Sequence, residues 1–264
     1  MKLPPIAIAL GLAGASLLAG QDLPQWVLSL AAVKRHMRAE LERLPNYMCA
    51  ETVERSERRN QASPFKQQTR LDLEVALVGG QEMLALGGAS EFAEARPETY
   101  IREGAFTTGM FSALTRNLFV ADNARTTGWG RESLDGREAL RYDFEVTELF
   151  SGFHLTTDTG EATVGVRGSY WVDSSTLDLL RIEERAVDIP LTLLMSEVTE
   201  TATYARTRIG ASEVLLPSTA TAVLTNLDGV ERKNVITYAG CREYQSESTI
   251  RFVEPEKTTA IKKQ

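Results

Sequence analysis

The two histidines of this chain are its clearest candidates for metal binding or acid–base chemistry. His36 precedes Glu40 by four residues, a spacing that can place two metal ligands on one face of a helix. No third ligand lies near them in the sequence, and the pair falls on the side of a helix predicted to face solvent. His154 could act as a general base, but no nucleophile or acid partner accompanies it. The sequence therefore predicts neither a metal site nor a cofactor.

Four glutamates occupy segments with the alternation of β-strands: Glu183, Glu184, Glu197 and Glu200. Alternate positions of such strands face solvent, and a glycosidase needs two carboxylates at a defined distance across a cleft. The chain has no Gly-x-Ser-x-Gly turn, no glycine-rich phosphate loop and no His-Glu-x-x-His helix. We therefore expect a protein that is not an enzyme.

Two cysteines, Cys49 and Cys241, are separated by most of the chain. Disulfides form and persist in exported proteins, and a bond between these two would bring their Cα atoms within about 7 Å. Closing so long a loop contributes roughly 5 kcal/mol of stability in the chain-entropy treatment. Such a bond would place the first strand beside the last. The alternative is two separate buried thiols.

An export signal is predicted for residues 1–20. Lys2 precedes an apolar stretch, Ile6 to Ala19, that falls short of the about 20 residues of a membrane span. The run Leu18-Ala19-Gly20 is typical of a lipid-attachment signal, but Gln21 stands where attachment requires a cysteine thiol. We expect cleavage near Gln21 and a periplasmic or secreted protein without a lipid anchor. An uncleaved anchor helix is the alternative.

The composition is that of a globular protein, with 43% hydrophobic and 25% charged residues and a formal net charge of −7. Basic residues are scattered, apart from the terminal Lys262-Lys263. Nucleic-acid binding is excluded because it needs a concentrated basic surface. No further stretch of about 18 apolar residues follows the signal, so the mature chain is not expected to cross a membrane.

Two segments have the periodicity of amphipathic helices. The first runs from about Leu23 to Leu44, and its mixed charges favour packing on a sheet over lying on a membrane surface. The second runs from Thr107 to Val120 and has large apolar residues on one stripe: Met110, Phe111, Leu114, Leu118 and Phe119.

Elsewhere apolar residues recur at every second position, as in "RLDLEVALV". Short turns separate these strands: Gly79-Gly80, Asp135-Gly136, Asp173 to Thr176, Gly210-Ala211 and Asp228-Gly229. Such a chain predicts an antiparallel meander whose apolar face the helices must cover. The predicted fold is therefore mainly β (α+β), a curved antiparallel sheet or half-barrel with both helices over its concave face. One domain, 21–254, is expected between the signal and a disordered tail, 255–264.

The segment "GSYWVDSSTLDLLRIEERA" resembles a hairpin of the periplasmic lipoprotein-carrier superfamily, which includes LolA- and LolB-like carriers and RseB-related sensor domains. The matching residues are Gly168, Trp171, Val172, Asp173, Thr176, Leu177, Leu180, Arg181 and Ile182. The chain also resembles secreted acidobacterial proteins with openings such as "LPNYMCAETVER". The superfamily resemblance implies a half-barrel with an apolar cavity and an arginine that contacts the ligand. Arg141 and Arg167 are candidates for that arginine by strand position, although both are expected on the solvated face.

The residues that could line such a cavity are apolar or aromatic, and each could equally fill the core: Trp26, Met37, Met110, Phe111, Leu114, Phe119, Tyr142 and Phe144. The first hypothesis is a non-enzymatic periplasmic binding protein that holds an acyl chain or a lipidated peptide of a lipoprotein, stabilised by about 0.8 kcal/mol for each buried methylene. The second is a β-sheet interaction or envelope-sensor module with a filled core and no lipid ligand.

Overall fold

The structure is a computed structural model that describes residues 23–88, 92–94 and 109–244. The predicted signal and the predicted tail lie outside the described residues. Its helices are α1 (Gln25–Glu42), α3 (Ala113–Phe119), α4 (Glu148–Ser151) and the 3₁₀ helix η1 (Leu191–Leu193). Its strands are β1 (Tyr47–Arg58), β2 (Lys66–Val78), β3 (Gln81–Leu86), β4 (Ala93–Glu94), β5 (Arg125–Leu134), β6 (Arg137–Val146), β7 (Phe153–Thr157), β8 (Gly160–Asp173), β9 (Leu179–Val187), β10 (Met195–Ile209), β11 (Ser212–Asn226) and β12 (Glu231–Glu243).

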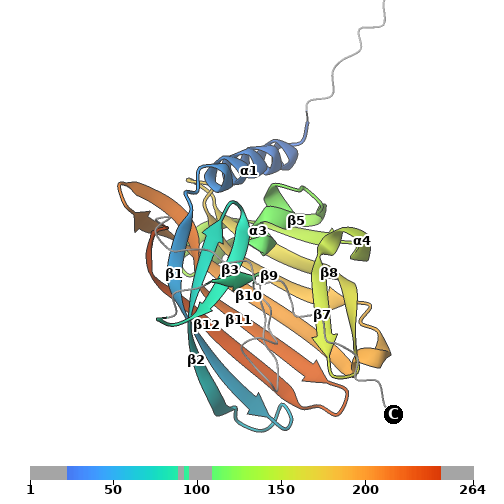
Figure 1. The fold of residues 1–264 in the computed structure, drawn as a ribbon. Coiled ribbons are helices and arrows are strands. Elements are labelled where there is room, and N and C mark those ends of the chain that lie inside the picture. Colours follow the sequence, from blue (N-terminus) through green and yellow to red (C-terminus); the bar gives the residue numbers. More distant parts are fainter. Residues whose placement is uncertain (1–22, 89–91, 95–108, 245–264) are drawn as a thin grey trace, which may run out of the picture.

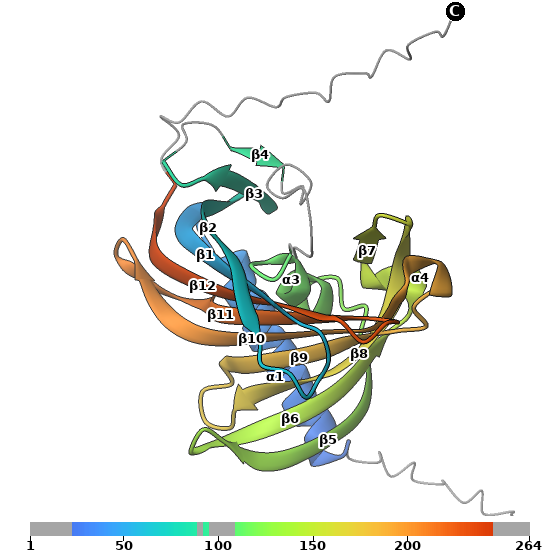
Figure 2. The same cartoon turned by 90° about the horizontal axis from the view of Figure 1, so that it is seen from below.

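One large antiparallel sheet organises the molecule. Its strand order is β4-β3-β2-β1-β12-β11-β10-β9-β8-β6-β5, and β7 pairs with β8 off this path. Sequential hairpins build both halves, and the pairing of β1 with β12 joins them. The sheet curves so that α3 lies on its concave side, while α1 crosses one end (Figures 1 and 2). The predicted mainly β fold, a curved antiparallel sheet with an N-terminal helix and a mid-chain helix, is confirmed.

The predicted hairpin turns lie where the sequence placed them. Asp135 and Gly136 both have positive φ, 51° and 80°, which suits the two-residue turn between β5 and β6. In the turn between β8 and β9, the Asp173 carboxylate accepts hydrogen bonds from the backbone N–H groups of Ser175 and Thr176. The carboxylate thus provides an acceptor for the N–H groups of the turn, and the hydrogen bonds it accepts lower the pKa of Asp173.

Helix α1 buries one apolar stripe, with Val33, Met37 and Leu41 in the core. It packs on the protein, as its mixed charges predicted. The prediction that His36 and Glu40 face solvent was wrong. Glu40 is only 6% exposed.

Arg206 of β10 explains the position of these two residues. Its guanidinium binds Glu40 of α1 at 2.9 Å and Asp178 at 2.5 Å. The Asp178 carboxylate also lies 2.9 Å from Nε2 of His36, within hydrogen-bond distance. These four residues fasten α1 to the sheet, so the polar side of the helix is partly covered by charged partners.

Helix α3 is shorter than the predicted Thr107–Val120 helix. Thr107 and Thr108 lie outside the described residues, and Gly109, with a φ of 91°, belongs to a turn. Glu82 of β3 accepts hydrogen bonds from the Gly109 backbone N–H at 3.0 Å and the Ser112 hydroxyl at 3.3 Å. These bonds hold the chain in a turn before the helix begins at Ala113.

The concave face is covered by aromatic contacts from the segment around α3. Phe111 packs 5.1 Å from the rings of both Tyr47 and Tyr238, and Phe119 packs 5.2 Å from Tyr170. The four-residue helix α4, the strand β7 and η1 were not predicted, because each is too short to show a period.

The disulfide between Cys49 and Cys241 is confirmed, with the two Cα atoms 4.1 Å apart. Cys49 lies in β1 and Cys241 in β12, so the predicted neighbourhood of the first and last long strands is also confirmed.

Removing the disulfide should destabilise the fold. The bond closes a loop with a sequence separation of 192 residues, which corresponds to roughly 5 kcal/mol in the chain-entropy treatment, less any strain in the folded state. We expect Cys49→Ala/Cys241→Ala to unfold at a markedly lower temperature than the oxidised wild type by differential scanning calorimetry. Dithiothreitol should lower the wild-type midpoint and leave the variant unchanged. Equal midpoints for wild type and variant would contradict this role.

A charge at Phe111 should also unfold the protein at lower temperature, because its ring is only 2% exposed between two tyrosines. Burying an unpaired carboxylate costs several kcal/mol. In a domain of this size, each kcal/mol of lost stability lowers the thermal midpoint by about 2–4 °C. We therefore expect Phe111→Asp to lower the midpoint by about 10 °C or more. Phe150→Asp is the matched control, since that ring is 55% exposed. Similar midpoints for the two variants would show that Phe111 does not hold α3 in place.

Candidate binding site on the concave face

Strand register arranges the inward-facing side chains in rows across the concave face. The apolar row consists of Tyr142, Tyr170, Ile182, Ala202, Ala220, Ile236 and Val53. Two residues further along each strand, the polar row consists of Phe144, Gly168, Glu184, Glu200, Ala222, Asn234 and Arg55. The concave face therefore combines an apolar surface with a line of ionisable and amide groups.

Six of the eight predicted cavity residues belong to one buried core cluster, and Leu114 packs against it: the six are Met37, Met110, Phe111, Phe119, Tyr142 and Phe144. Trp26 lies apart from them, stacked on Trp129 of β5 with ring centroids 6.3 Å apart and planes at 12°. Phe144 packs over Gly168, where an added Cβ would lie 2.8 Å from the ring. The sequence thus identified residues that meet in space.

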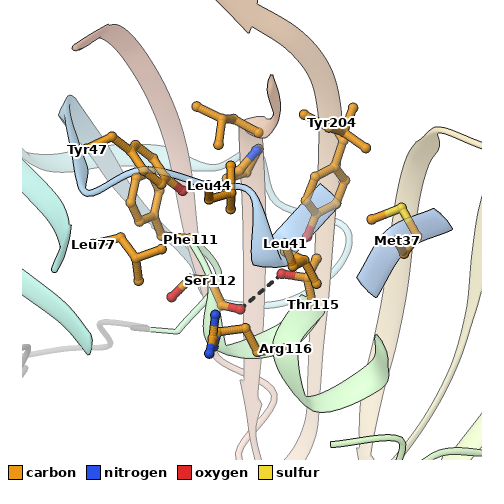
Figure 3. Close-up of a pocket in the computed structure, with 13 residues that line it drawn as sticks. Met37, Leu41, Leu44, Tyr47, Leu77, Phe111, Ser112, Thr115, Arg116 and Tyr204 are labelled. Carbon is orange, nitrogen blue, oxygen red and sulfur yellow. Dashed lines mark hydrogen bonds between the residues drawn. The ribbon is translucent and has the colours of Figure 1, made fainter. Parts of the chain in front are cut away.

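A small cavity lies where α1, α3 and the sheet come together (Figure 3). Met37, Leu41 and Phe111 contribute apolar walls, and Arg116 and Ser112 lie at its edge. The free volume is about 10 Å³, which is the room of a single water molecule. Within the described residues, the space between α1, α3 and the sheet is therefore filled by the protein's own side chains.

The acidic pair, Glu184 and Glu200, is the main feature that sequence reasoning missed. The two residues lie directly opposite on β9 and β10, and they are 6% and 7% exposed. Burial raises the pKa of Glu184 to about 8. Burial, and then the charge of Glu184, raises the pKa of Glu200 well above its usual value. The pair therefore keeps at least one proton at neutral pH.

A second group of buried acids lies near α3. Burial, with the charge of Glu82 adding to it, raises the pKa of Glu51 to about 8. Burial also raises the pKa of Glu82, although its hydrogen bonds from Gly109 and Ser112 oppose the shift. Burial raises the pKa of the Tyr238 hydroxyl, and the charges of Glu51 and Glu82 raise it further. Burial is therefore the main cause of the raised pKa values in this region.

The remaining candidate residues lie elsewhere. Arg141 and Arg167 are on the outer face, the face opposite the concave one, as expected; their guanidinium groups bind Asp143 and Glu145. His154 of β7 lies 3.5 Å from Glu161 at the surface. Within residues 23–88, 92–94 and 109–244, no three metal-ligating side chains gather in one place, and no helix is long and apolar enough to cross a membrane.

Comparison with known proteins identifies no family by sequence. No protein-family model matches the chain, and no curated protein matches it. Among solved structures, the chain is similar to a DUF1329 family protein from Desulfovibrio piger, with 13% identity over 84% of this chain and 95% of that chain and a TM-score of 0.45. It is weakly similar to MucB in complex with MucA(peri), with 14% identity over 78% of this chain and 92% of that chain and a TM-score of 0.21.

The acidic pair should make the protein less stable as pH rises. The pKa values of Glu184 and Glu200 are higher in the folded protein than in the unfolded chain. The folded state therefore binds more protons between about pH 4.5 and 8, and the free energy of unfolding falls as the pH rises through that window. Glu200→Gln removes one titrating group and resembles the protonated acid in shape. We expect this variant to unfold at a higher temperature than wild type at pH 9, with a smaller difference at pH 5.

Glu183→Gln is the control for this experiment, because Glu183 lies next to Glu184 on β9 but on the outer face. It should reproduce the wild-type dependence of the thermal midpoint on pH. A Glu200→Gln profile parallel to that of wild type would show that the acidic pair does not titrate in this range.

Proposed function

We propose that the chain is a non-enzymatic interaction or envelope-sensor module that acts outside the cytoplasm. The observation that carries this proposal is the packing between α1, α3 and the sheet. Small-molecule sites commonly enclose about 300–1,000 Å³, whereas this space, among the described residues, is about 10 Å³. Such close packing supports recognition of partners through the surface.

The location outside the cytoplasm rests on the disulfide, since such bonds persist in oxidising compartments. The predicted export signal agrees with it. Gln21, which has no thiol, supports release without a lipid anchor.

One exposed apolar surface fits a partner-binding role. The apolar rim consists of Leu191, Leu194 and Leu227, which are 73%, 52% and 50% exposed. The Leu227 backbone N–H donates to the Leu194 carbonyl at 2.9 Å, so η1 and the turn between β11 and β12 lie together. Adjacent exposed leucines are typical of contact surfaces.

The absence of enzymatic activity is part of the proposal. His36 is engaged with Asp178, so its ring serves to hold α1. The acidic pair is buried beside Gly168 and Ala222, and it keeps a proton at neutral pH. We therefore assign His36 to the attachment of α1, and the acidic pair to the pH dependence of stability.

Binding of an acyl chain is the second candidate function. The composition of the small cavity favours it, since apolar walls from α1, α3, β2 and β11 meet Arg116, Ser112 and Thr115 at one edge. An amphiphile could place its tail against the walls and its head near Arg116 once α3 moved outward.

Native mass spectrometry separates the two candidates. The full-length chain is exported in a bacterial host and purified from the periplasm without detergent. We expect an unmodified mature chain that starts near Gln21 and carries no acyl species. Acyl adducts that disappear in Arg116→Gln would replace the first candidate with the second.

Photocrosslinking tests the apolar rim directly. A photoreactive residue in place of Leu191 should give a discrete crosslinked product in intact cells, and one in place of the exposed Glu213 should not. Identical patterns at the two positions would contradict recognition through the rim.

A further inference from the structure

The outer face contains a groove that the proposed function does not use. It crosses β5, β6, β8, β9 and β10, on the face of the sheet opposite the concave one. Its volume is about 770 Å³, within the range of small-molecule sites. The lining is mostly polar. It includes three arginines, Arg141, Arg167 and Arg185, and three acids of the outer face, Asp143, Glu145 and Glu183. The buried acidic pair also contributes to it.

Two arginines face each other inside this groove. Arg167 of β8 and Arg185 of β9 are directly opposite in the strand register, and Thr199 of β10 lies next to Arg185. Like charges in directly opposite positions destabilise a sheet. An oxyanion bound between the two guanidinium groups would turn this repulsion into a pair of charge-assisted hydrogen bonds.

Carboxylates of the groove do not neutralise both members of the arginine pair. Three acids of the groove each bind an arginine: Asp143 binds Arg141 at 2.8 Å, Glu183 binds Arg181 at 2.6 Å, and Glu145 binds Arg125 at 2.6 Å and Arg167 at 3.4 Å. Within the described part of the chain, no acid lies within ion-pair distance of Arg185. Arg185 is therefore the arginine of the groove that these carboxylates leave without an ion pair.

A row of acceptors runs beside the arginines. Asp143, Ser169, Glu183 and Thr201 are opposite one another on β6, β8, β9 and β10, two residues along each strand from the arginine row. Two residues of a strand span about 7 Å. The Ser169 hydroxyl already donates to Asp143 at 2.6 Å, which leaves further lone pairs on both oxygens.

We propose that this groove binds a small sugar acid, a ligand with one carboxylate and several hydroxyl groups. Its carboxylate lies between Arg167 and Arg185, and its hydroxyls donate to the acceptor row. Asp143 and Glu183 are already paired with arginines, so an ammonium group would gain little there, whereas neutral hydroxyls still find acceptors. A second anionic group would meet these acids and be repelled.

Isothermal titration of the exported, oxidised protein at low salt tests the site with glucuronate, glucose and acetate. Glucose has the hydroxyls without the anion, and acetate has the anion without the hydroxyls. We expect glucuronate to bind at least tenfold more tightly than either. Arg185→Gln should weaken glucuronate binding at least tenfold, and Arg208→Gln, an exposed arginine elsewhere on β10, should leave it unchanged.

Thermal unfolding distinguishes loss of the site from loss of the fold. Without ligand, Arg185→Gln should unfold at the wild-type temperature or slightly above it, because the opposed charges are gone. Glucuronate should raise the wild-type midpoint and leave that of Arg185→Gln unchanged. Equal affinities for the three probes, or undiminished glucuronate binding by a folded Arg167→Gln/Arg185→Gln variant, would overturn the proposal. Neither result depends on whether the apolar rim binds a partner.

Discussion

The pairing of β1 with β12, fixed by the disulfide between them, is the constraint on which the rest of the structure depends. Without it the chain would form two separate sets of hairpins, β1 to β4 and β5 to β12. With it the sheet is continuous, and its curvature gives a concave side. Helix α1 directly precedes β1, so the same pairing delivers that helix to the end of the sheet where Arg206 can bind it. A single long-range contact thus sets the positions of both the sheet and its covering helix.

Sequence reasoning succeeded where the determining interactions are local. Turns such as Asp135-Gly136 depend on backbone conformations that few residues adopt, so their positions can be read from the chain. It failed where contacts between residues far apart in the sequence determine burial or the start of a helix. Glu40 is buried because of Arg206, 166 positions away, and the start of α3 is set by Glu82, 30 positions from Ser112. The neighbourhood of first and last strands was predictable only because cysteines mark it.

The acidic pair shows a different limit. On β10, Val198, Ala202 and Tyr204 share the alternation of Glu200, whereas the intervening positions are threonines, so the pattern indicates that Glu200 points inward. On β9, Ile182 and Ala186 indicate the same for Glu184. The sequence does not show that the two glutamates lie directly opposite each other, because that depends on the register between β9 and β10. The inward phase of each strand could therefore be read from the sequence, but the pairing of the two acids could not.

Both faces of the same strands contain opposed like charges, and solvent makes their consequences different. Inside, Glu184 and Glu200 relieve the conflict by keeping a proton, because a buried carboxyl is less costly neutral than ionised. Outside, Arg167 and Arg185 cannot do so, since a guanidinium remains charged at every physiological pH. Solvent screens these two arginines instead, and the carboxylate of Glu145 offsets part of the charge of Arg167. Like charges are therefore relieved by protonation on the concave face, and by solvent and ion pairing on the outer face.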